Sequence, residues 1–488
     1  MSAGKGLAGA FILLCGVRCC YGHIGSPDVY YEGGAGPYKL LVAIRPPTVI
    51  PGVARVEIQA LSAGIQSIRI LPMPLAGDGA KFPPTPDFAR RSKEDPRFYT
   101  GTLWMMGFGS WQVRVEVDGA NGPGRLAIPV PAIASNTAGM RKQLGAGLFA
   151  AMLFLVFGLV SIVGAGVREA RLQPGVAPPP VLRKRSYIAM AIAGLTVGLI
   201  LYNGDRWWTS EADSYRNKVY KPLQMTAALE RGNRLTLQLK DPGWFTFRRL
   251  DDLVPDHDHL MHLFAIRMPG MDRMWHLHPD EGDAGIFTLD LPSMPAGRYK
   301  LFADIVHENG LAETATTEAD LPAVTRRPLS GDDAAGAAPP VSEADTSRTI
   351  SMLPNGYRLV WLRGNAPMVA KRMELFQFQL EDPNGKPARD TEPYMGMAGH
   401  AEFVKDNGKV FAHVHPAGSV SMAALAMTQA MTQGARADMA SMPEMHGMRI
   451  PALVSFPYGF PEPGPYRVFV QMKRGGEVVT GVFDADVK

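Results

Sequence analysis

Two long apolar segments interrupt a chain in which apolar and polar positions otherwise alternate over short distances. Residues 144–166 give about 23 apolar or small residues without a charge, and residues 187–204 form a second uncharged run. Roughly 20 apolar residues are enough for one membrane-spanning helix. The pattern therefore predicts two transmembrane helices, with Trp207 and Trp208 after the second as an interfacial belt.

The predicted loop between these segments, residues 167–186, is basic. Its only acid is Glu169, and its basic residues are Arg168, Arg171, Arg183, Lys184 and Arg185. Short loops rich in Arg and Lys stay on the cytoplasmic side of a membrane. We therefore expect a cytoplasmic loop, with both large flanking regions outside. The alternative, two buried core helices, explains neither the charge-free lengths nor the basic loop.

The N-terminus has the order of a secretory signal peptide. Lys5 precedes the apolar stretch Leu7–Leu14, which is too short to span a bilayer, and small residues follow. We expect residues 1–22 to be the signal peptide, with cleavage after Gly22. All three cysteines, Cys15, Cys19 and Cys20, would then leave with it.

The first outward region, residues 23–140, reads as β structure. Apolar positions alternate with polar ones between Trp111 and Val117, which is the period of a strand with one buried face. A glycine-rich turn over residues 118–124 leads into another apolar strand pattern. Short strands at this spacing predict a small β-sandwich.

The second outward region repeats itself. Leu237–Pro242 recurs as Phe378–Pro383 at an offset of 141, His262–His278 as His400–His415 at offsets of 138 and 137, and Gly297–Tyr299 as Gly464–Tyr466 at 167. Internal similarity of this kind predicts two homologous units.

These offsets set the expected boundaries. The repeats occupy residues 205–325 and 350–488, and residues 326–349, rich in Pro, Ala, Gly, Ser and Asp, form a flexible linker. The change of offset marks a methionine-rich insertion at residues 417–449 in the second repeat. The predicted fold is mainly β, with three Ig-like β-sandwich modules and a two-helix transmembrane hairpin.

Composition narrows the classes of function. The 488 residues are 46% hydrophobic and 20% charged, with a net charge of +4. This excludes a disordered chain and gives no reason to expect nucleic acid as a partner. The sequence also lacks Gly-x-Ser-x-Gly, His-Glu-x-x-His and phosphate-binding glycine loops, so no enzymatic motif is present.

Ten of the eleven histidines lie in the two repeats. Each repeat has one histidine before a turn and a His-x-His pair after it. Residues two apart on a strand share a face, so each hairpin brings three imidazoles together. The predicted metal ligands are His262, His276 and His278 in the first repeat, and His400, His413 and His415 in the second. The alternative is a structural polar cluster.

Differences between the repeats favour copper over zinc. His257 and His259 correspond to Met395 and Met397, and thioethers suit Cu(I) whereas imidazole suits copper in both oxidation states. The alternative is that these four are variable loop residues.

The insertion offers further soft ligands, namely Met442, Met445, His446 and Met448. Methionines there could equally be apolar filler, since Met427 and Met431 stand one helical turn apart. After cleavage His23 would chelate Cu(II) through its imidazole and α-amine, but the first module has no other imidazole to complete that site.

The chain resembles bacterial periplasmic copper-handling sandwiches, the CopC-like and YtkA-like proteins, and the His-x-His-Pro domains associated with heavy-metal efflux. The residues that carry this resemblance are Pro393–Gly396, Gly399-His400 and His413–Pro416. It implies an Ig-like fold and copper as the bound metal.

Our first hypothesis is therefore a bacterial inner-membrane protein with both terminal regions in the periplasm. It would sequester copper, or deliver it to an efflux or metalloenzyme-assembly partner. The second hypothesis is a non-enzymatic accessory or scaffold subunit of a larger membrane complex, with structural histidines. A copper oxidase or monooxygenase is a third, without a supporting motif.

Overall fold

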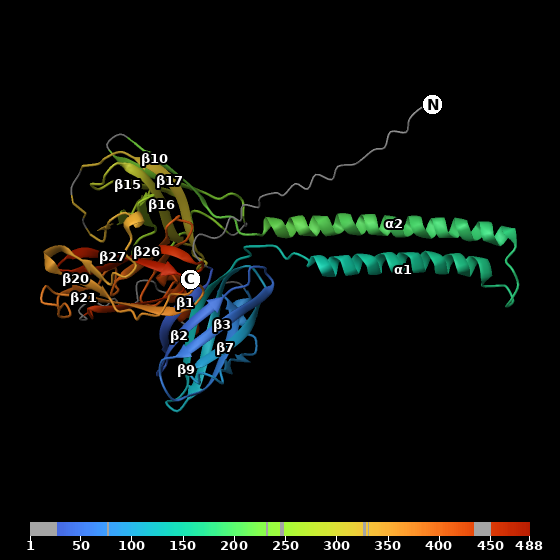
Figure 1. Cartoon of the computed structure of the whole chain (residues 1–488), viewed down its shortest axis with the longest axis horizontal. Coiled ribbons are helices and arrows are strands. Elements are labelled where there is room, and N and C mark those ends of the chain that lie inside the picture. Colours follow the sequence, from blue (N-terminus) through green and yellow to red (C-terminus); the bar gives the residue numbers. More distant parts are fainter. Residues whose placement is uncertain are drawn as a thin grey trace.

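The computed structural model describes residues 27–75, 78–230, 233–244, 248–325, 328–329, 331–433 and 450–488. The chain is mainly β, and its strands form several sheets, from which two long helices extend to one side (Figure 1). The predicted signal peptide, residues 1–22, and His23 lie outside the described residues.

Two sheets make up the first β region. Their strand orders are β1-β2-β3-β7-β6 and β5-β4-β8-β9. The alternation predicted after Trp111 lies in β8, where Val113, Val115 and Val117 are buried in the core between the sheets. The elements are β1 (Val29–Ala35), β2 (Tyr38–Arg45), β3 (Gly52–Ala60), β4 (Ile65–Pro74), a 3-10 turn η1 (Asp78–Lys81), β5 (Asp87–Phe88), β6 (Arg90–Arg91), β7 (Phe98–Met105), β8 (Gly109–Gly119) and β9 (Gly124–Ala132).

Helices α1 (Lys142–Glu169) and α2 (Pro180–Asn217) form a hairpin and run side by side away from the sheets (Figure 1). Both are long and apolar enough to cross a membrane by length and composition, and both exceed the two predicted segments. The hydroxyl of Ser186 donates to the carbonyl of Gly164 at 2.7 Å and links the two helices. The start of α1 and the end of α2 lie next to each other, so the sheets before and after the hairpin are at the same end of it (Figure 1).

The strands of the first repeat form one continuous sheet together with β18, which belongs to the segment that follows the repeat. Its order is β14-β15-β11-β10-β17-β16-β12-β13-β18. The strands are β10 (Gln224–Leu229), β11 (Arg234–Lys240), β12 (His262–Met268), β13 (Arg273–Leu277), β14 (Asp280–Glu281), β15 (Ile286–Asp290), β16 (Gly297–Val306), β17 (Ala312–Leu321) and β18 (Ala334–Ala337).

The second repeat has the same central strand order in two sheets. The order β24-β23-β26-β27 matches β13-β12-β16-β17, and β21-β25 matches β11-β15. Its elements are β19 (Ile350–Met352), η3 (Pro354–Gly356), β20 (Arg358–Trp361), β21 (Glu374–Glu381), β22 (Thr391–Glu392), β23 (His400–Lys405), β24 (Phe411–Val414), α3 (Met422–Gln433), β25 (Leu453–Tyr458), β26 (Gly464–Arg474) and β27 (Glu477–Val487).

The expected flexible linker is instead partly ordered between the repeats. Strand β18 pairs with β13, and η2 (Val341–Glu343) follows it. One of its small residues, Gly336, serves close packing, because a Cβ there would come within 2.8 Å of Thr480.

The two repeats pack face to face around an aromatic core. Phe302 of the first repeat stacks on Phe411 of the second with ring centroids 4.3 Å apart, and Phe264 lies 5.0 Å from Phe411. Val404, Phe469 and Val482 of the second repeat belong to the same buried cluster. The interface therefore joins the strands that carry the histidines.

His307, outside this interface, lies in a buried ionic cluster. Its Nδ1 is 2.7 Å from Asp252 and its Nε2 is 3.1 Å from Glu313, and Arg248 binds Glu313 at 2.8 Å. Burial lowers the pKa of His307, but the hydrogen bonds and charges of Glu313 and Asp252 outweigh it, so its pKa lies above 6.5. A protonated His307 and Arg248 together face three carboxylates, because Arg248 also pairs with Asp241.

A group whose pKa is raised by folding stabilises the folded state below its unfolded pKa, and that stabilisation is lost as pH rises through the folded pKa. We expect the His307→Gln variant to be less stable than the wild type at low pH. The difference in unfolding free energy between the two proteins should shrink as pH rises above 6.5. Melting temperatures of both proteins across pH measure this. A deficit that is constant with pH would contradict it.

Candidate metal centre

Eight histidines gather where the two repeats meet. They come from the segment before β12, from the hairpins β12–β13 and β23–β24, and from the residues just after those hairpin strands. Ring centroids are 5.1 Å apart for His257 and His400, 5.6 Å for His262 and His413, and 5.3 Å for His400 and His413. The set is His257, His259, His262, His276, His278, His400, His413 and His415. The predicted trios thus form one cluster rather than two separate ones.

The hairpin registers place the histidines as their turns predict. Phe264 pairs with His276, so extending the register sets His262 opposite His278. Glu402 pairs with His413, so the same extension sets His400 opposite His415. Alternation along each strand then turns these side chains to one face.

Two groups of three histidines have donor nitrogens within 4.8 Å of one another. The first is the predicted trio of His262, His276 and His278. The second differs from the predicted trio, because His257 of the first repeat replaces His413 beside His400 and His415. Strand periodicity could not reveal a ligand from the opposite repeat, since it describes only neighbours within one hairpin.

His257 reaches the second repeat from a tight turn. His257 and Asp258 have φ values of +52° and +67°, and backbone hydrogen bonds join Asp256 to His259 on either side. Met395 and Gly396, with φ values of +48° and +75°, occupy the equivalent turn. The two turns share one backbone form although their side chains differ.

Several rings are held through Nδ1 by an oxygen atom. The Nδ1 of His278 is 3.1 Å from Asp333, that of His413 is 3.3 Å from Asp304, and that of His415 is 3.0 Å from the carbonyl of Val420. An acceptor at Nδ1 fixes the proton there and leaves the Nε2 lone pair free, as in most metal-bound histidines.

The Nε2 atoms of these three rings have no hydrogen-bond partner among the residues that the structure describes. Within the described part of the chain, the buried imidazole nitrogens without a hydrogen-bond partner are Nε2 of His257, His278, His413 and His415, and both ring nitrogens of His400. Buried polar atoms of native proteins are usually paired, and a group of orphans needs an explanation. A bound cation supplies one.

The ring nitrogens of His262 and His276, unlike those above, have hydrogen-bond partners. Nδ1 of His262 lies 3.0 Å from Nε2 of His276, and Nε2 of His262 lies 2.9 Å from the carbonyl of Asp256. Nδ1 of His276 lies 2.9 Å from Gln471 and 3.2 Å from the hydroxyl of Tyr394. A metal at this trio must therefore replace a hydrogen bond.

The cluster favours neutral imidazoles. Burial, followed by repulsion from neighbouring histidines, lowers the pKa of His278 to about 3 and holds those of His262, His276, His400 and His413 well below 6.5. Burial, with His257 beside it, lowers the pKa of His415 to about 4. Neutral imidazole is the form that binds a metal.

Carboxylates that the sequence analysis did not single out surround the rings. Glu402 is fully buried, and in the described structure neither of its carboxylate oxygens has a partner. Burial raises the pKa of Glu402 well above 4.5 and that of Asp304 to about 7. Glu402 stands two residues after His400 on the same strand face, which is a signal that the sequence already contained.

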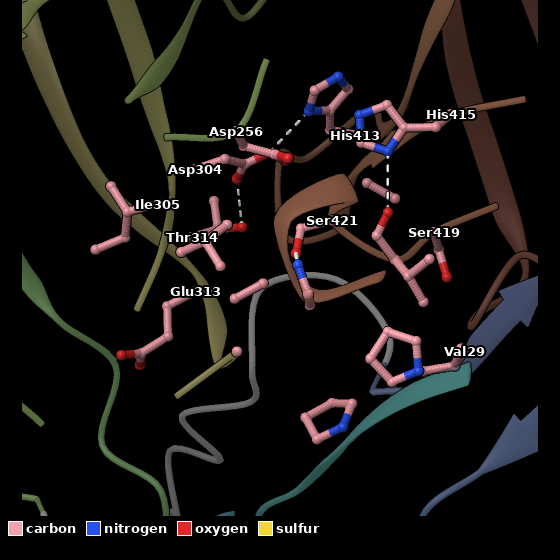
Figure 2. A pocket seen from close by; sticks show the side chains of 18 of the residues that line it. Val29, Asp256, Asp304, Ile305, Glu313, Thr314, His413, His415, Ser419 and Ser421 are labelled. Carbon is pink, nitrogen blue, oxygen red and sulfur yellow. Dashed lines mark hydrogen bonds and ion pairs between the residues drawn. The ribbon is translucent and has the colours of Figure 1, made fainter. Parts of the chain in front are cut away.

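A cavity of about 150 Å³ reaches the cluster. Figure 2 shows His413 and His415 on one side of it, Asp256 and Asp304 beside them, and Val29 of the first β region on the far side. The first β region, both repeats and the segment leading into α3 all contribute to its wall.

The methionines divide into two groups. Met397 is buried and Met395 is half-buried, both in the turn just before β23. Met442, Met445, His446 and Met448 lie outside the described residues. Part of the predicted insertion forms α3, where Met427 approaches Gly310 and so lies in a packed environment.

Comparisons with solved structures found matches at low identity and low TM-score. Similar solved structures include fibronectin(III)-like modules of Clostridium thermocellum CbhA (7% identity, 58% of this chain, 94% of that chain, TM-score 0.20) and a tetra-tandem repeat of a large adhesion protein (10%, 91%, 72%, TM-score 0.16). Salmonella alpha-2-macroglobulin matches at 8% identity over 95% of this chain and 24% of its own, with a TM-score of 0.19.

The search of curated proteins found no match. A family model described as a domain of unknown function, DUF8832, matches residues 212–322 and 352–488, which together are about half of the chain. These segments contain both histidine-bearing hairpins. The chain therefore belongs to the DUF8832 family.

Proposed function

We propose that this chain is a membrane-anchored periplasmic protein that holds copper in the histidine cluster between its two repeats. Three Ig-like modules on a transmembrane hairpin would present the metal, and the protein would sequester it or deliver it to an efflux or metalloenzyme-assembly partner. The observation that carries the proposal is the set of buried imidazole nitrogens that, among the described residues, have no partner.

The donor set supports a metal as the occupant. Donor atoms at about 2.0–2.1 Å from a metal stand roughly 3.3 Å apart, so nitrogens within 4.8 Å of one another need only a small closure. A structural role would leave several orphaned nitrogens in a desolvated interior, and each costs about 1–3 kcal/mol.

Ligand type favours copper among the metals. The cluster offers imidazoles, with methionines in the adjoining turn, and the described residues contain no cysteine. Imidazole and thioether together suit copper, whereas zinc sites rarely use methionine. The resemblance to CopC-like and YtkA-like proteins points the same way.

The proposed periplasmic location is argued from the two apolar helices and the loop that connects them. Two helices of adequate length and hydropathy, with basic residues around their connecting loop, support a cytoplasmic loop by the positive-inside rule. Both β regions then lie across the membrane in the periplasm, where the predicted signal peptide would direct the N-terminal region.

The test is a copper titration of the full chain in detergent micelles, with Cu(I) under reducing conditions and with Cu(II). We expect at least one tightly held equivalent in the wild type. His413→Ala/His415→Ala should weaken binding at the site of His257, His400 and His415 by more than about 100-fold, because His415 is a direct ligand there and the loss of even an outer-shell partner costs roughly 10–100-fold.

Lys409→Ala, on the exposed turn of the same hairpin, is the matched control and should bind like the wild type. Circular dichroism and melting curves establish that each variant folds. Less than one equivalent in the wild type, or equal binding by the folded double variant, would exclude the copper function and favour structural histidines.

A further inference from the structure

The two repeats meet about a pseudo-twofold axis that relates the metal-binding residues. His276 of the first repeat contacts Gln471 of the second at 2.9 Å, and His413 of the second contacts Asp304 of the first at 3.3 Å. His276 and His413 are equivalent in the repeat alignment, as are Asp304 and Gln471. The middle histidine of each repeat therefore contacts the same strand position of the opposite repeat.

Ring positions obey the same relation. His262 and His413 are 5.6 Å apart, and the equivalent pair, His400 and His276, is 6.4 Å apart. The pairing of His262 with Asp304 across β12 and β16 has its counterpart in His400 and Gln471 across β23 and β26. The pseudo-symmetry therefore extends through the whole cluster.

This relation assigns a place to Met395. His257 lies in its turn with positive φ and brings its ring to 5.1 Å from His400 and 5.0 Å from His415. Met395 occupies the equivalent turn with the same left-handed backbone, which side chains other than glycine rarely adopt. His257 lies beside His400 and His415. The equivalent arrangement under the pseudo-twofold axis is Met395 beside His262 and His278.

We propose that the interface holds two inequivalent copper sites, each completed by the opposite repeat. One is built from His257, His400 and His415. The other is built from His262, His278 and Met395, where the metal replaces one of the two hydrogen bonds of His262. The proposal rests on the copper function proposed above and specifies how many ions bind and which ligands hold them.

The two sites differ in their ligand types. The first is all-imidazole, and the second adds the thioether of Met395 to two imidazoles. Imidazole suits copper in both oxidation states, whereas a thioether favours Cu(I). The first site therefore accepts Cu(II) and the second prefers Cu(I).

The experiment combines X-ray absorption and electron paramagnetic resonance on the full chain in micelles. Loaded with Cu(I), the wild type should bind two equivalents, with sulfur scattering from one of them. After mild oxidation, one equivalent should give a Cu(II) resonance. Met395→Leu should remove the sulfur scattering and weaken one Cu(I) site more than about tenfold, whereas Met352→Leu, an exposed control, should change neither.

A second variant is expected to gain a Cu(II) signal, a result that misfolding could not produce. Met395→His should make both sites all-imidazole and bring the Cu(II) resonance to two equivalents. Two equal copper sites in the wild type, a single site, or sulfur scattering that survives Met395→Leu would overturn the inference and leave the copper function standing. A wild type that binds no copper would instead overturn both.

Discussion

Replacing His400 with leucine should abolish tight copper binding at the site of His257, His400 and His415 without destabilising the metal-free protein. Both ring nitrogens of His400 are buried and, in the part of the chain that the structure describes, have no partner. Removing them ends a desolvation cost of about 1–3 kcal/mol, and leucine has a similar volume. The metal-free melting temperature should therefore stay level or rise, while the copper affinity of that site falls by more than about 100-fold, beyond the cost of an outer-shell change.

His262→Leu is the informative contrast, because this residue is satisfied at both nitrogens by His276 and the carbonyl of Asp256. Its loss should lower the free energy of unfolding of the metal-free protein by about 1–3 kcal/mol. Thermal unfolding with and without copper measures both effects. If His400→Leu were as destabilising as His262→Leu in the absence of metal, the histidines would be structural and the metal centre would be excluded.

The strand pattern was sufficient to predict which histidines share a face. Period-two alternation and the Asp406–Gly408 turn set the β23–β24 hairpin, and its register confirms that His400 faces the His413 and His415 strand. These are local properties, fixed by residues within about 15 positions of one another. The same reasoning applied to β12–β13 is also confirmed.

The joining of the two trios could not be predicted from the same pattern. It depends on which sheet faces meet, and therefore on contacts such as Phe302 with Phe411, whose residues are far apart in the chain. His257 enters the second site only because of that packing. Glu402 is different, since its position two residues after His400 was visible in the sequence and only its burial between the repeats was not.

Breaking one buried ion pair should have the largest effect on stability. Arg467 of β26 is fully buried, its Nε donates to Asp484 at 2.8 Å, and its Nη1 donates to the carbonyls of Met271 and Pro339. It therefore ties the second repeat to a turn of the first and to the segment between them. Asp484→Ala leaves an uncompensated guanidinium in the interior, which should cost about 3–5 kcal/mol of unfolding free energy.

Asp486→Ala is the matched control, because Asp486 is exposed on the same strand and should unfold like the wild type. Denaturant unfolding of the full chain in micelles measures both variants. A loss from Asp484→Ala no larger than that of the control would show that the guanidinium is hydrated or paired elsewhere. Since both sets of copper ligands draw on the same repeat interface, Asp484→Ala should also weaken copper binding, although Asp484 is no ligand. Loss of stability with full copper affinity would mean that the metal centre forms independently of this contact.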